Sequence, residues 1–143
     1  MKRYIGTKII HAEPEQRNEE PGYKVRYPDG YESWSPALAF NEAYRACDSM
    51  NFGLAIEALK KGYKVARRGW NGKGMWLVLV PGQAEVTLRD GTPYKSALPE
   101  LNVCEILPHI DMWTVNAHGR RAMLPGWLAS QTDMLSDDWE IIE

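Results

Sequence analysis

The sequence predicts an α+β protein: a small antiparallel sheet with one main amphipathic helix, preceded by a small ββα module. Two observations lead to this class. Residues 51–62 carry apolar side chains at helical spacing, whereas most other apolar segments are short and separated by turn-forming residues, as in antiparallel sheets. A chain of 143 residues is long enough for one core and a small appended unit. We therefore divide it into an N-terminal hairpin-plus-helix module, 1–49, and a larger main domain, 50–143.

The N-terminal module is predicted to be a hairpin followed by a helix. Apolar and charged residues alternate through 23–34 on both sides of a Pro-Asp-Gly turn at 28–30, which is typical of a half-buried hairpin. A third strand is expected at about 8–12. Ser35 followed by Pro36 indicates a helix start, with the serine as the N-cap and the proline in the first turn.

The main helix is predicted to start at Asn51 and to stop at Gly62, a residue typical of helix C-termini. Its apolar residues recur at positions i, i+3, i+4 and i+7. They are Phe52, Ala55, Ile56 and Leu59.

Short apolar segments predict the strands of the main domain. These begin at Val65 and continue at 75–80, 84–88, 110–115, 121–124 and 139–142. Residues 89–108 contain three prolines and little periodicity, so we expect a long irregular connection there, of the kind that often shapes a site.

Composition excludes several classes of protein. A formal net charge of −2 argues against binding to a nucleic acid polymer, since such proteins usually have a basic excess. No apolar run approaches the ~18 residues of a membrane span, and none of signal-peptide length follows Met1, so we expect a cytoplasmic protein without membrane contact. Cys47 and Cys104 form no CxxC pair, which argues against a zinc site or a disulfide framework.

Charge is unevenly distributed along the chain. Six basic and no acidic residues occur between Lys60 and Lys73, and five acidic and no basic residues occur between Asp133 and Glu143. Two solvated faces explain this pattern as well as a functional role does.

No constellation of nucleophile and base is evident. His109 beside Asp111 is a possible base pair, but a structural histidine before a strand, with an aspartate that accepts hydrogen bonds from a loop or a ligand hydroxyl, is the better explanation. The carboxylates of Asp133, Asp137 and Asp138 could in principle coordinate Mg²⁺. Adjacent acidic residues on a terminal turn, however, more often face solvent or lie at a helix end. We therefore predict no catalytic residue, no metal site and no cofactor.

The glycine-rich loop at 68–74 fits neither the Walker nor the Rossmann spacing. It does offer binding chemistry: an indole to stack on a base, cations and backbone amides for phosphate, and an amide for directional hydrogen bonds. The side chains are Trp70, Arg67, Arg68, Lys73 and Asn71. An indole that fills the core under a turn explains Trp70 equally well.

Four separated blocks resemble one known family. They are residues 50–62, 65–75, 108–112, and 127–135 followed by Asp138-Trp139. In this order they resemble the second type of Thoeris anti-defence protein, a phage-encoded domain, over about residues 50–143. The region Gln83–Leu107 and residues 1–49 depart from the family; within the latter, Gly22–Pro36 resembles an N-terminal extension of phage proteins.

The resemblance implies a non-catalytic sponge that acts in the cytoplasm of the infected bacterial host. Members of this family capture cyclic ADP-ribose-type signals of the Thoeris system without degrading them, and some also hold cyclic dinucleotides. They are homo-oligomers, typically tetramers. A nucleotide-hydrolysing enzyme and a phage structural or adaptor protein are the alternative functions.

The resemblance also implies a set of ligand-binding residues. Trp70 is expected to stack on the adenine, with other residues of its loop beside it and a second group opposite. Ser130 and Thr132 fit equally well as caps of the turn that leads to Leu135. The complete set is Trp70, Arg68, Asn71, Lys73, Asp111, Ser130, Gln131, Thr132 and Asp133.

Overall fold

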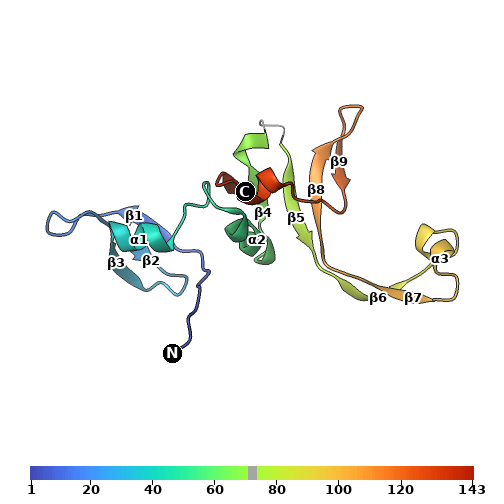
Figure 1. The fold of residues 1–143 in the computed structure, drawn as a ribbon, viewed down its shortest axis with the longest axis horizontal. Coiled ribbons are helices and arrows are strands. Elements are labelled where there is room, and N and C mark those ends of the chain that lie inside the picture. The colour runs from blue at the N-terminus through green and yellow to red at the C-terminus, as the bar shows by residue number, and fades with distance from the viewer. Residues whose placement is uncertain (71–73) are drawn as a thin grey trace. The chain divides into compact units, whose positions relative to one another are not determined.

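A computed structural model describes residues 1–70 and 74–143 of the chain, which form two compact units, Met1–Ser49 and Met50–Glu143. Both units combine helices with antiparallel sheets, so the predicted α+β class is confirmed (Figure 1). Among the helices of the described residues, none combines the length and the apolar character that crossing a membrane requires.

The first unit is a three-stranded antiparallel sheet with one helix. Strands β1 (His11–Pro14), β2 (Gly22–Arg26) and β3 (Glu32–Pro36) lie in the order β1-β2-β3, and helix α1 (Ala37–Ala43) follows. The predicted hairpin is confirmed. The first strand lies slightly later than the expected 8–12, because its register on the hairpin pairs Pro14 with Tyr23.

Helix α1 begins one residue later than predicted. Ser35 remains in β3, paired with Tyr23, and its hydroxyl donates to the carbonyl of Pro36 instead of capping the helix. Pro36 therefore occupies the N-cap position, where it makes no side-chain hydrogen bond.

The core of the first unit is small. Val25 is buried, and the ring of Tyr23 stacks on Phe40 of α1 with the ring centroids 4.1 Å apart. On the sheet, Trp34 donates its indole N–H to the carbonyl of Glu15 and packs so closely on Gly22 that a Cβ there would collide with the ring.

The second unit begins with the predicted amphipathic helix, α2 (Phe52–Lys60). The Asn51 side chain caps it by accepting a hydrogen bond from the Leu54 amide at 2.9 Å. Its inner face buries Ala55, Ala58 and Leu59. The helix ends before Gly62, whose φ of +93° explains why glycine stands there.

Helix α2 packs on a five-stranded antiparallel sheet in the order β10-β4-β5-β8-β9 (Figure 1). In this order β10, the last strand of the sequence, lies beside β4, which is the earliest of the five strands in the sequence. The predicted strands are confirmed within one or two residues. They are β4 (Lys64–Arg67), β5 (Trp76–Val80), β8 (His109–Val115), β9 (Arg121–Leu124) and β10 (Trp139–Ile142).

The region 89–108 is not an irregular connection, as the sequence had suggested. It contains a short helix, α3 (Pro93–Ala97), and a strand, β7 (Val103–Ile106), that pairs with β6 (Gln83–Thr87). Together β6, α3 and β7 form an arm that extends from the five-stranded sheet (Figure 1). Strand β7 has only four residues and its pairing with β6 is interrupted by a bulge, so the alternation of apolar and polar residues is too short to reveal the strand in the sequence.

The core of the second unit lies between α2 and the five-stranded sheet. Its central side chain is Trp139, which is 0% exposed. The other buried members come from α2, from strands β4 and β5, and from Met50, which precedes the helix and forms an isolated bridge with Trp139. They are Met50, Ala55, Ala58, Leu59, Val65 and Leu77.

Candidate functional site

Trp70 lies in a short 3₁₀ turn, η1 (Arg68–Trp70), directly after strand β4. Its ring is half-buried and meets two other indoles edge-on, with centroid distances of 5.4 Å to Trp139 and 6.2 Å to Trp127. Phe52 completes this aromatic cluster, 5.5 Å from Trp139 and 6.4 Å from Trp127. Trp70 therefore packs against the core while part of its surface stays accessible.

A charged network lies next to the aromatic cluster. Arg67 donates from Nη1 to Asp133 Oδ1 at 2.8 Å and from Nε to Asp138 Oδ1 at 2.9 Å. All three side chains are largely buried, with exposed fractions of 13%, 12% and 24%. We refer to these residues as the Arg67 network; they join the end of β4 to the C-terminal part of the domain.

The network also holds the backbone and the indole of the Trp70 turn. The Gly69 amide donates to Asp138 Oδ2 at 2.8 Å, and the Arg68 amide donates to the Asp138 carbonyl at 3.2 Å. Trp70 Nε1 donates to Asp133 Oδ1 at 3.4 Å.

Both carboxylates of the network keep their charge. Burial raises the pKa of Asp133, but hydrogen bonds from Arg67 and Ser130 outweigh it, so that the pKa lies below its ordinary value. The hydrogen bond from Arg67 lowers the pKa of Asp138 more than burial raises it. Hydrogen bonds to Asp138 and Asp133 in turn raise the pKa of Arg67.

Ser130 and Asp133 form the N-terminus of helix α4 (Gln131–Leu135). Ser130 Oγ accepts from the Asp133 amide, and Asp133 Oδ2 accepts from the Ser130 amide, both at 3.0 Å, which is a capping box. Ser130 is therefore the N-cap of α4, as the capping interpretation of the sequence predicted. Thr132 lies within the helix with Gln131, and both are exposed.

Asp111 of β8 is buried at 7% exposure. Its Oδ1 accepts from the Gly126 amide at 3.0 Å and lies 3.6 Å from His109 Nε2. Trp127, which follows Gly126 in the sequence, donates its amide N–H to the Ile110 carbonyl at 2.8 Å. Asp111 therefore anchors the segment that presents Trp127 to the aromatic cluster.

A mainly apolar cavity of about 470 Å³ lies on the other side of Trp127, between α2 and β8. Ile56, Leu79 and Ile110 form part of its wall, and Lys60 and His109 contribute polar groups. None of the predicted site residues within the described chain lines this cavity.

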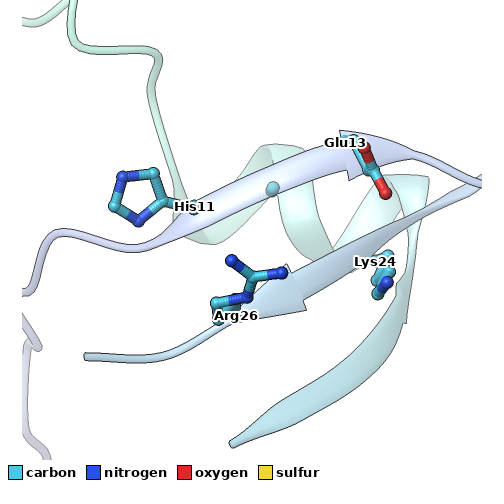
Figure 2. Close-up of a pocket in the computed structure, with 5 residues that line it drawn as sticks. His11, Glu13, Lys24 and Arg26 are labelled. Carbon is cyan, nitrogen blue, oxygen red and sulfur yellow. The ribbon is translucent and has the colours of Figure 1, made fainter. Parts of the chain in front are cut away.

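The first unit contains a smaller hollow, of about 150 Å³, on strands β1 and β2 (Figure 2). His11, Glu13, Lys24 and Arg26 line it (Figure 2). Both cations pair with Glu32, at 3.4 Å from Lys24 and 3.1 Å from Arg26. This hollow thus combines charges of both signs and shows no preference for an anion.

The structure brings Trp70, Arg68, Ser130 and Asp133 together, and within the described residues it connects Asp111 to them through the segment that holds Trp127. Asn71 and Lys73 lie outside the described residues. Among the described residues, no group of His, Cys, Asp or Glu side chains has a metal-binding arrangement.

Trp127 and Asp138 were missing from the predicted ligand-binding residues, and Arg67 was considered only as a cation for phosphate, not as a partner of the two aspartates. The two charge runs of the sequence were the available signal, because Arg67 belongs to the basic run and its two partners to the acidic run. These runs are thus partly paired with each other, and they are not simply two solvated faces.

Comparison with known proteins agrees with the boundary between the two units. A family model described as the Thoeris anti-defense 2-like domain matches residues 50–142 and leaves the first unit outside. The protein Thoeris anti-defense 2 of Bacillus phage SP01 is 34% identical over 93 residues, which cover 65% of this chain and 94% of that relative. Through residues 50–142, the chain therefore belongs to the Thoeris anti-defense 2-like domain family, as its four sequence blocks indicated.

Proposed function

We propose that the protein is a phage anti-defence sponge, which binds a cyclic nucleotide immune signal in the cytoplasm of the infected host and withholds it intact from the defence system. The family match over residues 50–142 carries this proposal. The expected ligands are cyclic ADP-ribose isomers, with cyclic dinucleotides as a second class.

We propose the Trp70 turn as the surface that binds the ligand. Its indole is fixed from behind by Trp127 and Trp139, so the orientation of the exposed part is set before a ligand arrives. Arg68 precedes it in the same turn and is exposed, which places a cation near the phosphates of a stacked nucleotide. Stacking of one base contributes about 1–3 kcal/mol, so additional contacts are needed for tight binding.

The polar groups beside Trp70 favour binding over catalysis. Asp133 and Asp138 accept hydrogen bonds from Arg67 and the backbone, and their lowered pKa values make them poor proton donors near neutral pH. His109 and Asp111 are the residues that a hydrolase would use. Asp111 already accepts a hydrogen bond from the Gly126 amide.

The deciding experiment is recovery of the ligand. The protein is incubated with a cyclic ADP-ribose isomer, separated from unbound ligand by gel filtration and then heat-denatured. A sponge releases the unmodified molecule, whereas a hydrolysed product, or turnover of excess ligand that His109→Ala abolishes, would establish the enzyme instead.

Trp70→Ala tests the stacking surface. Because stacking contributes about 1–3 kcal/mol, affinity should fall roughly 5- to 150-fold in calorimetry. Trp113→Ala is the matched control, since Trp113 stacks on Trp76 at 5.9 Å, outside the aromatic cluster. Equal affinities of both variants would exclude Trp70 as the contact, and absence of binding by the unaltered protein would favour an adaptor role.

The proposal includes a homo-oligomer, with a tetramer as the expected form. The arm of β6, α3 and β7 exposes Tyr94, Leu101 and Val103, and a two-stranded ribbon is marginally stable in water by itself. A second copy that covers the arm would stabilise it. Light scattering gives the molar mass directly. A monomeric mass at protein concentrations where ligand binding is observed would contradict the proposed oligomer.

A further inference from the structure

We infer that Arg67, Asp133 and Asp138 are positioning residues, which hold the Trp70 turn in the orientation that receives a ligand and do not contact the ligand themselves. The inference rests on the proposed function of Trp70. It revises the predicted site, in which Asp133 was a ligand contact, and it removes Arg67 from the cations available for phosphate.

Asp138 fixes the backbone of the turn. Its carboxylate accepts from the Gly69 amide at 2.8 Å, and its own carbonyl accepts from the Arg68 amide at 3.2 Å. A Cβ at Gly69 would lie 2.8 Å from Asp138 Oδ2, so a side chain there would push the carboxylate and the turn apart. The carboxylate thus holds the path of the backbone, and glycine permits its close approach.

Asp133 fixes the indole. Oδ1 accepts from Arg67 at 2.8 Å and from Trp70 Nε1 at 3.4 Å, while Oδ2 accepts from the Ser130 amide at 3.0 Å. The N-terminus of helix α4 therefore sets the position of this carboxylate, and the carboxylate directs one edge of the Trp70 ring. Each oxygen of the carboxylate therefore already accepts at least one hydrogen bond from the protein, and Oδ1 accepts two.

Arg67 joins the two carboxylates through different nitrogens of one planar group. A guanidinium can do this because its donors form a rigid fork, whereas a lysine ammonium is a single point charge. One cation between two anions leaves a local excess of one negative charge beside the turn. A ligand phosphate gains nothing by approaching this network, which leaves recognition to Trp70 and its neighbours.

The test compares Asp138→Asn with Asp137→Asn. Both changes remove one acidic charge, but Asp137 is exposed and only Asp138 contacts the turn. Loss of a charged hydrogen bond that orders the turn should weaken binding of a cyclic ADP-ribose isomer about tenfold or more in Asp138→Asn. Asp137→Asn should bind as the unaltered protein does.

Two further readouts separate positioning from plain stability. The apparent Kd equals the intrinsic Kd divided by the folded fraction, so a variant that is less stable but still almost fully folded at the measuring temperature keeps its affinity. Arg67→Lys preserves the charge but not the fork, and it should retain the fold, judged by circular dichroism, while binding weakly.

Gly69→Ala displaces the turn without changing any charge and should also weaken binding, which covers the case in which a charge variant fails to fold. Unchanged affinity in the folded Asp138→Asn, Arg67→Lys or Gly69→Ala protein overturns the inference. Absence of binding by the unaltered protein refutes the proposed function instead, so the two failures are distinguishable.

Discussion

The two units of the molecule differ in what holds them together. Among the described residues, Val25 is the only apolar side chain buried within residues 1–49, whereas the second unit buries a cluster centred on Trp139. The first unit relies on backbone pairing, on the stack of Tyr23 and Phe40, and on exposed ion pairs, which contribute little. The comparison explains why we propose ligand binding on the second unit: its core is large enough to hold an indole rigidly.

Trp139→Ala should have the largest effect, because it removes the side chain that fills the centre of the second unit. Deletion of a buried tryptophan costs about 3–5 kcal/mol of unfolding free energy. Urea unfolding followed by circular dichroism measures the loss. Trp34→Ala, the same change in the first unit, should leave the unfolding transition of the second unit in place; an equal effect of both would show that the units do not differ as described.

Val25→Ala should unfold the first unit selectively. Removal of two buried methyl groups costs about 2 kcal/mol with the cavity included, a large share of the stability of so small a core. Hydrogen exchange should therefore accelerate in β2 and β3 but not in α2, and ligand affinity should remain unchanged. Val103→Ala, at a position that is 45% exposed, provides the control. Weaker ligand binding in Val25→Ala would show that the first unit contributes to the site.

Asn51→Ala should have the smallest effect of the three, about 1 kcal/mol, because it removes one helix cap. Its decrease in thermal stability should be confined to the second unit. Asn41→Ala, an exposed position of α1, should change neither unit. A loss in the second unit of more than about 3 kcal/mol would mean that the cap organises far more than the start of α2.

Local patterns predicted much of the fold. Helix α2 followed from apolar spacing, with Asn51 and Gly62 at its ends, and the strands followed from short apolar segments between turns. Strand β6 of the arm followed in the same way, but α3 and β7 did not, since β7 is short and pairs with β6 across a bulge. Ser35 was misplaced because strand pairing competed successfully with capping for the same residue.

The site was predictable only in part. Trp70 was predicted as a ligand contact from the chemistry of its glycine-rich turn and from the family resemblance, both of which are local in sequence, and its role stays a prediction. The Arg67 network was not, because its ion pairs connect residues 66 and 71 positions apart. Which acid meets Arg67 depends on the register that places Trp139 opposite it across β10 and β4, and no local pattern encodes that register.

Asp133 also constrains how this domain can change during evolution. One residue closes the capping box with Ser130, pairs with Arg67, accepts from Trp70 and offers its carbonyl to the indole of Trp139 at 2.9 Å. Residues that share one such hub have non-additive substitution effects. These positions are therefore expected to be inherited as a group and to covary among relatives.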